Sequence, residues 1–307
     1  MKRYILSRVG QGLATLLVVS LFVFVMVRMT GSPLDMLLPV EATPEMRAQA
    51  AEELALDRPV VVQYFVFLGN LLQGDLGTSI RTRLPVTELL ADRLPNTLQL
   101  VGASIVLALL IAVPLGVAAA LGRGGFWDGL ARAMALLGQS IPSFWVGIVL
   151  IAIFSGVLGW LPAGRQGGPE HLVLPAVTLG LFGFMLSGVL RLLRGSMIDV
   201  LDGDFIRFAR IKGVPERRIA WHHALSNALI PVITFIGFYF GIMMSGTVVV
   251  ETVFAWPGVG RLAYEAVQWR DYPVVQGVVI VIALITILAN LAVDLLYCYL
   301  DPRIRYG

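Results

Sequence analysis

Hydrophobic residues in this chain gather into blocks that are much longer than those of a soluble protein. A helix that crosses a membrane needs about 20 mostly apolar residues, and six segments of the chain satisfy that length. They are residues 9–27, 98–121, 133–158, 172–190, 229–250 and 274–296. The pattern predicts an all-α, polytopic membrane protein with six transmembrane helices.

The first apolar block has one feature of a secretory signal, because Lys2, Arg3 and Arg8 lie at its start. It is, however, longer than the apolar region of a signal peptide, and no Ala-x-Ala cleavage site follows it. We therefore interpret it as an uncleaved first transmembrane helix.

Composition agrees with the apolar pattern. Hydrophobic residues make up 57% of the 307 residues and charged residues only 14%, against about 45–50% and about 25% in soluble domains. The net charge of +3 does not indicate nucleic-acid binding, since no basic run with neighbouring aromatic residues accompanies it. The single cysteine, Cys298, excludes an internal disulfide.

The positions of Lys and Arg predict how the helices are oriented. If the N-terminus is cytoplasmic, fourteen basic residues lie in the cytoplasmic termini and loops, and three lie in the short opposite loops. Because positive residues favour the cytoplasmic side, both termini are predicted to be cytoplasmic. The expected layout is a cytoplasmic N-terminus (1–8), a first transmembrane helix (9–28), an extracytoplasmic loop region (29–96), a five-helix permease core (97–300) with a cytoplasmic loop at 191–228, and a cytoplasmic C-terminus (301–307).

The extracytoplasmic region is expected to contain helices of its own. Thr43 and Pro44 form a helix start, an N-cap hydroxyl followed by proline in the first turn. That helix is predicted to run to Leu56, where Asp57-Arg58-Pro59 stops it. Residues 60–72 are apolar but too short to span, so they lie at the membrane interface or pack on the helix bundle.

The expected spans contain few ionisable residues, and their polar residues are uncharged. An ion-coupled carrier usually holds Asp, Glu or His at mid-membrane, so this pattern disfavours one. The uncharged polar residues either line a translocation path or only hydrogen-bond to neighbouring helices. They are Gln139, Ser140, Ser187, Thr234 and Ser245.

No pattern in the chain indicates catalysis. A P-loop needs Gly-x-x-x-x-Gly-Lys-Ser/Thr, and the only lysines, Lys2 and Lys212, lie in no such setting. The run Gly-Val-Gly-Arg-Leu-Ala at 258–263 matches a dinucleotide fingerprint, but without a strand–helix–strand context we expect a structured turn. His222 and His223 are adjacent and cannot share one helix face. We predict no catalytic, metal or cofactor site.

The segment 202–216 is the best candidate for contact with a partner. Asp204 at its start and Arg210 and Lys212 near its end suit a helix dipole, and Gly213 can end the helix in the left-handed conformation. One face of this helix would present Phe205, Phe208 and Ala209. Such a face either docks on a cytoplasmic partner or rests on lipid headgroups, and the residues alone leave both open.

A family resemblance decides between these two. Residues 209–213 read Ala-Arg-Ile-Lys-Gly, and residues 223–231 read His-Ala-Leu-Ser-Asn-Ala-Leu-Ile-Pro. Together they resemble the coupling-loop ("EAA") motif of ABC importer permeases in the variant of the peptide/nickel branch. Arg207 and Phe208 stand where the general motif has Glu and its first Ala. Blocks similar to that branch follow in family order at 74–79, 140–144, 158–162, 250–261, 270–274 and 301–306, and the long first loop resembles that of the B-type subunit.

The resemblance implies an ABC type I importer permease fold. It also implies the role of a transmembrane permease subunit in an ATP-driven importer of di- or oligopeptides or a related small solute. The implied partners are a second, C-type permease subunit, two ATP-binding subunits that carry ATP and Mg, and an extracytoplasmic solute-binding protein. The implied location is the inner membrane of a bacterium or archaeon. The solute stays open among dipeptides, oligopeptides, glutathione, nickel complexes and sugars.

The resemblance also implies site residues. Those of the ATPase-coupling helix are Asp204, Phe205, Phe208, Ala209, Arg210, Lys212 and Gly213. Those of the extracytoplasmic mouth are Glu251, Trp256, Pro257, Gly258 and Gly260. Two rival functions are disfavoured: an ion-coupled secondary carrier, by the span interiors, and a membrane scaffold without transport, by the polar residues along the spans.

Overall fold

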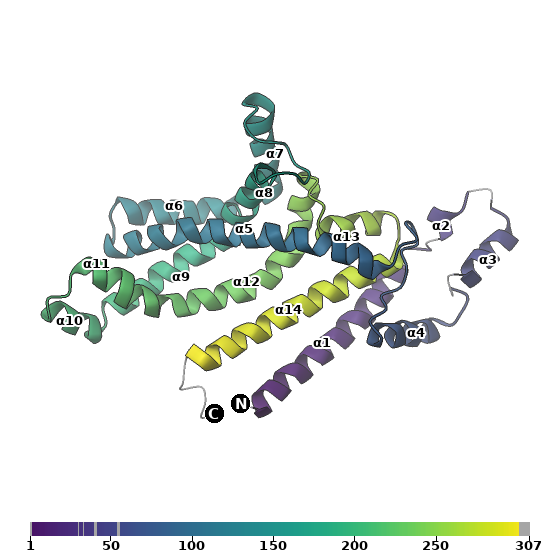
Figure 1. Ribbon diagram of the computed structural model, residues 1–307, viewed down its shortest axis with the longest axis horizontal. Coiled ribbons are helices and arrows are strands. Elements are labelled where there is room, and N and C mark those ends of the chain that lie inside the picture. Colours follow the sequence, from purple (N-terminus) through teal and green to yellow (C-terminus); the bar gives the residue numbers. More distant parts are fainter. Residues whose placement is uncertain (1, 30, 33, 40–41, 54–55, 301–307) are drawn as a thin grey trace. The chain divides into compact units, whose positions relative to one another are not determined.

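The computed structural model describes residues 2–300 apart from residues 30, 33, 40–41 and 54–55. Within these residues the protein is all-α and contains no strand, only one isolated bridge between Thr78 and Pro85 (Figure 1). The predicted fold class is confirmed. The block at 301–306, which resembles the peptide/nickel branch, lies outside the described residues.

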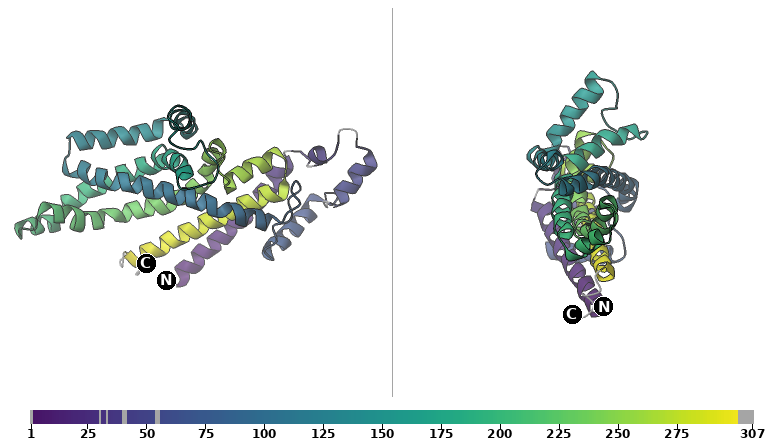
Figure 2. Two further views of the ribbon diagram at one scale, coloured as in Figure 1. Left: turned by 45° about the horizontal axis from the view of Figure 1, so that its top comes forward. Right: turned by 90° about the vertical axis from the view of Figure 1, so that its left-hand side faces the viewer.

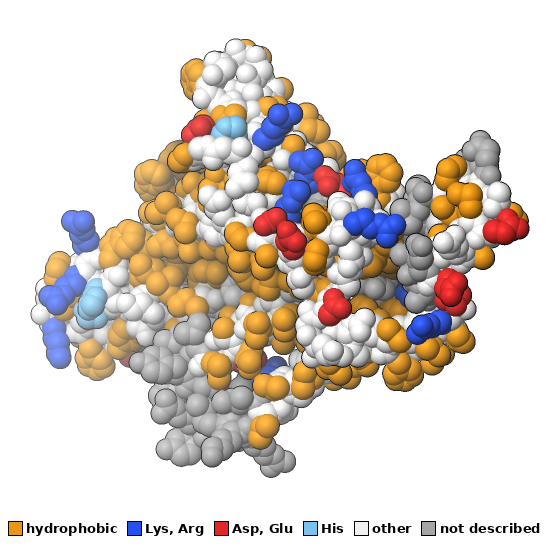
Figure 3. Space-filling model, turned by 45° about the vertical axis from the view of Figure 1, so that its right-hand side comes forward, with side chains coloured by type: hydrophobic (Ala, Val, Ile, Leu, Met, Phe, Trp, Pro, Cys, Tyr) orange, Lys and Arg blue, Asp and Glu red, His pale blue; other side chains and the backbone are white. Residues whose placement is uncertain are grey.

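Four helical segments are long and apolar enough to cross a membrane. They are Leu6–Met29 in α1 (Lys2–Met29), Val86–Leu121 (α5), Glu216–Val253, which ends with α12 (Leu225–Val253), and Tyr272–Leu295 in α14 (Tyr272–Leu300). The number rises to six if each of two bent helix pairs counts as one span. Figure 3 shows one face of the molecule, on which hydrophobic side chains cover much of the surface.

The spans expected over 133–158 and 172–190 correspond to two bent helix pairs, and the apolar pattern does not reveal the bends. Helix α6 (Phe126–Ser140) meets α7 (Ser143–Leu150) and the π-helix η1 (Ile151–Val157) at 99°, and α8 (Glu170–Leu181) meets α9 (Phe184–Leu201) at 52°. At the first break, Pro142 disfavours the helical conformation in the residue before it, and Ile141 is accordingly extended at φ −102° and ψ 125°. Helix α9 continues to Leu201, beyond the end of the apolar block at residue 190.

The chain forms two compact units. The first comprises Met1–Thr97 and Pro257–Leu288, and the second comprises Leu98–Trp256 and Ala289–Gly307. The region 29–96 thus belongs to one unit with residues 257–288. In the core of the first unit, Val86 and Leu90 lie with Val259 of α13 (Val259–Gln268) and Val278 of α14.

Short helices complete the first unit: α2 (Leu34–Leu37), α3 (Pro44–Glu53) and α4 (Val60–Leu72). The predicted helix start is confirmed, because α3 begins at Pro44 and the Met46 N–H donates to Thr43 Oγ1 at 3.3 Å. Hydrogen bonds from its own backbone N–H and from Thr43 lower the pKa of Glu45 in that first turn. Residues 60–72, expected to be too short to span, form helix α4.

Asp271 holds residues 79–81, which precede α5, in place through hydrogen bonds. Its side chain is buried and accepts hydrogen bonds from Ser79 Oγ at 2.6 Å, the Ile80 N–H at 3.1 Å and the Arg81 N–H at 3.3 Å. These bonds satisfy a buried carboxylate that would otherwise be costly.

The second unit holds both bent pairs and α12. Its core includes Leu100, Leu174, Val250, Phe254 and Trp256, which are all buried. Two short helices, α10 (Asp204–Ile211) and α11 (Glu216–Arg218), lie together at one end of this unit, before the π-helix η2 (Ile219–Ala224) (Figure 2). This end carries the segment that sequence analysis assigns to partner contact.

Candidate functional site

The two helix breaks in the second unit open on the same cavity, which has a volume of about 300 Å³. Residues 138–143 surround the first break, and Leu179 with residues 182–184 surround the second. Helix α12 closes the cavity with Tyr239, Ile242, Met243 and Gly246. Broken helices at membrane depth are tolerated where they line a cavity, and in transporters they mark solute sites.

Two of the five polar residues predicted for the translocation path line this cavity, namely Gln139 and Ser140. Gln139 Oε1 also accepts a hydrogen bond from Arg191 Nη1 at 3.2 Å. The other three do not line the cavity. Ser187 is buried against Gly138, where an added Cβ would lie 2.7 Å from its Oγ. Thr234 donates to the Ile230 carbonyl at 3.1 Å, and Ser245 is exposed beside the cavity residue Gly246.

The breaks place helix N-termini at the cavity. Helices α7 and α9 begin at Ser143 and Phe184, both of which line it. Their N-cap residues, Pro142 and Gly183, make no side-chain hydrogen bond to the first-turn N–H groups. Such N–H groups and the helix dipole favour a negatively charged group. The cavity therefore offers amide, hydroxyl and backbone donors to an anionic polar solute.

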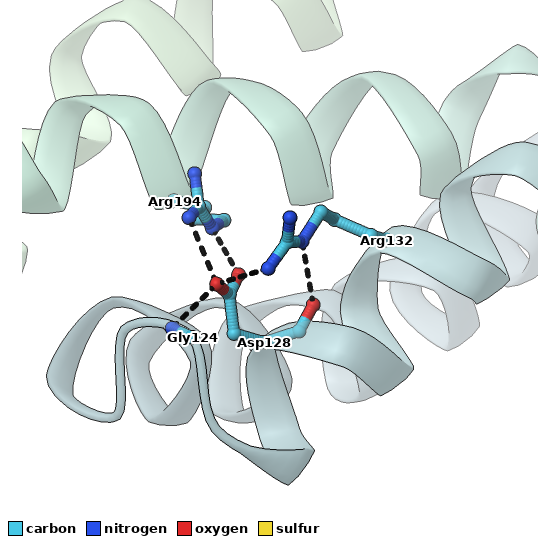
Figure 4. A network of polar contacts seen from close by, with 4 residues as sticks. All are labelled: Gly124, Asp128, Arg132 and Arg194. Carbon is cyan, nitrogen blue, oxygen red and sulfur yellow. Dashed lines mark hydrogen bonds and ion pairs between the residues drawn. The ribbon is translucent and has the colours of Figure 1, made fainter.

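A buried polar network lies in the same unit between α6 and α9 (Figure 4). Asp128 is 1% exposed and accepts hydrogen bonds from Arg132 Nη2 at 2.7 Å, the Gly124 N–H at 2.9 Å and Arg194 Nη2 at 3.0 Å. Arg194 Nε also donates to its second oxygen. Bidentate pairing of this kind fixes geometry as well as charge, so the network holds α9 against the start of α6.

Sequence reasoning missed this network, because its residues lie outside the apolar blocks that predict the spans. The helices continue beyond the expected ends and so carry ionisable residues that were assigned to loops. The available signal was Asp128 and Arg132, which are four residues apart at the start of an apolar helix and so share one face.

Helix α10 presents two exposed aromatic side chains. Ile206 is fully buried, whereas Phe205 is 49% and Phe208 65% exposed. Ala209 is half-buried, and Asp204 pairs with Arg207 at 3.4 Å. A helix held by one buried residue while its aromatic residues stay outside the chain's own core is suited to dock on a partner.

The end of α10 is fixed by its turn. Gly213 has a φ of 74°, so the predicted left-handed conformation is confirmed. Arg210 Nε donates to Glu216 Oε1 at 2.7 Å across this turn, and that hydrogen bond raises the pKa of Arg210. The Lys212 N–H donates to the Phe208 carbonyl at 3.1 Å. These bonds hold α10 and α11 as one corner.

Most of the residues predicted for the mouth are buried. In the second unit, Glu251 and Trp256 are 0% and 2% exposed. In the first unit, the Pro257 carbonyl accepts from Asn96 Nδ2 at 2.9 Å, and Gly258 is the N-cap of α13. Gly260 is also buried, in the first turn of α13. The run 258–263 is thus the start of a helix, and these side chains act by packing rather than as an open surface.

Comparison with known proteins covers the whole chain in two parts. The family described as "Binding-protein-dependent transport system inner membrane component" matches residues 112–306, and the family of the N-terminal part of such membrane components matches residues 1–101. The chain belongs to this family. It is accordingly a transport subunit and a multi-pass protein of the inner membrane.

Relatives of known name support the same assignment. The glutathione transport system permease protein GsiC of Salmonella typhimurium is 42% identical over 307 residues, covering all of both chains, and that of Escherichia coli K12 is 39% identical over the same length. An inward-facing structure of the MetNI methionine ABC transporter superposes with a TM-score of 0.57 at 17% identity, covering 69% of this chain and 96% of that one. This likeness shows the type I importer permease fold.

The function is therefore that of a permease subunit of an ABC importer. The family resemblance expected from the coupling-loop motif is confirmed, and none of these relatives supports the ion-coupled carrier.

Proposed function

We propose that this permease subunit serves an importer of glutathione or a closely related short peptide. The observation that carries the proposal is the 42% identity over the full length to glutathione transport system permeases. The cavity at the helix breaks adds chemical support. Glutathione is an anionic tripeptide, and the cavity offers it an amide, hydroxyls and the N-termini of α7 and α9.

The chain forms half of the translocation path, and a C-type permease subunit supplies the other half. Two ATP-binding subunits bind and hydrolyse ATP with Mg, and an extracytoplasmic binding protein delivers the solute. Both termini lie in the cytoplasm. The support for this arrangement is the family itself and the distribution of basic residues.

Helix α10 is the contact to an ATP-binding subunit in this proposal. Phe205 and Phe208 insert into the partner, while Ile206 and the Arg210–Glu216 pair keep the corner rigid. ATP-driven closure of the partners then moves α10, and rigid-body rocking of the permease alternates access to the cavity.

The test is uptake by the purified complex in liposomes, with labelled glutathione, trimethionine, nickel and maltose supplied separately. We expect saturable, ATP-dependent uptake of glutathione, reduced by Gln139→Ala or Ser140→Ala. Thr252→Ala is a matched control, since Thr252 is exposed on α12 and donates only to the Val248 carbonyl. Uptake of nickel or maltose without glutathione would contradict the proposed solute, and uptake without ATP would contradict the mechanism.

A further inference from the structure

A second cavity, of about 250 Å³, lies within the first unit, apart from the proposed path. Its wall includes Arg28 of α1, Arg58 and Gln63 at the start of α4, Asp75 in the following turn, and Gln276 of α14. A water molecule occupies about 30 Å³ in the liquid, so this cavity has room for a small organic solute.

Two guanidinium groups at this cavity have no acidic partner among the described residues. Within the described residues, neither Arg28 nor Arg58 forms an ion pair. Arg28 donates from Nε and Nη2 to Gln63 Oε1 at 3.1 and 2.6 Å, and its guanidinium carbon lies 3.4 Å from the centre of the Phe24 ring. These contacts orient the group but leave its charge unneutralised.

Other arginines in this unit do pair with carboxylates. Arg47 and Arg270 both pair with Asp35, and Arg261 pairs with Glu265. The only carboxylate that lines the cavity within the described residues is that of Asp75, whose Oδ1 already accepts from the Gly77 N–H at 2.8 Å. The wall therefore carries more positive than negative charge.

A buried amide adds an unpaired donor to the wall. Gln276 is 5% exposed, and its Nε2 is the one buried side-chain nitrogen or oxygen of the described residues without a hydrogen-bond partner. A buried donor left unpaired is costly, and a leucine would fill similar space without that cost. Gln276 lines the cavity, and because its amide nitrogen is covered, a rotation of this side chain would bring that unpaired donor to an acceptor inside the cavity.

We propose that this cavity binds the carboxylate of a small solute, either a free amino acid or a short peptide. Arg58 and Gln276 donate to the carboxylate oxygens, and Arg28 supplies the nearby positive charge. Guanidinium groups match carboxylate geometry. Asp75 gives the cavity a place for the ammonium group of a zwitterion. The site is separate from the cavity at the helix breaks, since all of its residues belong to the first unit.

Binding of glycylglycine and of glycylglycinamide to the purified detergent-solubilised complex, without binding protein, tests this site by calorimetry. The two dipeptides differ in the terminal carboxylate. We expect the amide to bind at least about tenfold more weakly, as loss of a charge-assisted hydrogen bond requires. Arg58→Gln and Gln276→Leu should each weaken glycylglycine binding by about tenfold, whereas the melting temperature without ligand stays the same or rises for Gln276→Leu.

Arg83→Gln and Gln268→Leu are matched controls in the same unit, because both side chains are exposed and neither lines the cavity. Equal binding of both dipeptides, or unchanged affinity in Arg58→Gln and Gln276→Leu, would overturn the proposal. So would loss of binding in Gln139→Leu alone, which would place the carboxylate in the proposed translocation path. Displacement by inorganic phosphate at lower concentration than glycylglycine would assign the site to phosphate groups instead.

Discussion

At the residue scale, Gly213 owes its role to backbone conformation and not to space. Its φ is 74°, and no heavy atom lies within 4 Å of an added Cβ. A left-handed residue with a Cβ costs about 1–2 kcal/mol. Gly195, in α9, also has nothing within 4 Å of an added Cβ but carries no positive φ, so it is a matched comparison.

We predict that Gly213→Ala weakens ATP-dependent uptake, because strain of about 1 kcal/mol displaces α10 relative to α11 and so disturbs the Arg210–Glu216 pair. Gly195→Ala should be neutral or stabilising by up to about 1 kcal/mol, since alanine is the better helix former. Uptake and melting temperature of the purified complex measure both effects. Equal behaviour of the two variants would contradict the conformational role of Gly213.

Asp128 illustrates a residue whose importance depends on its partners. We predict that Asp128→Asn lowers the melting temperature and the yield of folded protein. The side chain of Arg194 is only 29% exposed, and the substitution removes the negative charge that pairs with it. Arg132→Gln should have a smaller effect, since that side chain is 61% exposed. A larger loss in Arg132→Gln than in Asp128→Asn, measured by thermal unfolding, would refute this order.

The residues differ in how well the sequence predicts them. The Thr43 cap, the Gly213 turn and the exposed faces of Phe205 and Phe208 follow from local rules of helix ends and amphipathicity. The partner of Asp128 could not be predicted, because Arg194 is distant in sequence and its position depends on how α6 and α9 pack.

At the scale of elements, hydropathy predicts which segments form apolar helices but does not predict where a helix bends. An apolar run has the same average whether it is straight or bent. The apolar runs 133–158 and 172–190 therefore predicted two spans but not the bends that the structure shows in both regions. Pro142 carries the signal of the first break in its own residue type, while Gly183 at the second break is one glycine among 32 in the chain.

We predict that Pro142→Ala reduces glutathione uptake by more than about half while the complex still assembles, because Ile141 is then free to adopt helical geometry and α6 can extend into the cavity. Pro175→Ala is the control, since Pro175 lies inside α8 and does not line the cavity. Uptake and size-exclusion chromatography report the two properties. A larger loss of uptake in Pro175→Ala would contradict the role of the first break.

The aromatic residues of α10 allow a sharper element-level prediction. Phe208→Ser should weaken binding of the ATP-binding subunit by about tenfold or more, because docking would bury a phenylalanine worth about 1.5–3 kcal/mol. The melting temperature of the isolated permease should not change, since Phe208 is 65% exposed. Ile206→Ser should instead lower that temperature, because Ile206 is fully buried. Co-purification at graded salt and thermal unfolding separate these outcomes.

At the scale of the whole molecule, the division of the chain into units depends on contacts that no local pattern contains. Ser79 and Asp271 lie 192 residues apart and share a buried hydrogen bond at 2.6 Å. Val86 likewise packs with Val259 and Val278. The extracytoplasmic region 29–96 was predicted from hydropathy and charge, which carry no information on the part of the chain with which it packs. The cavity beside Gln276 could not be predicted from local pattern either, since its walls come from both stretches of the first unit.

The orientation of the whole molecule in the membrane is predicted from the distribution of its basic residues, and it can be measured directly. Cys298 is the only cysteine, so Cys298→Ser gives a background without thiols. On that background, Gln73→Cys after α4 and Lys212→Cys after α10 each place one thiol at an exposed position. If basic residues set the topology, a membrane-impermeant maleimide added to intact cells labels position 73 and leaves position 212 unlabelled until the cells are lysed. Labelling of 212 in intact cells would reverse the orientation and remove α10 from reach of any cytoplasmic ATP-binding subunit.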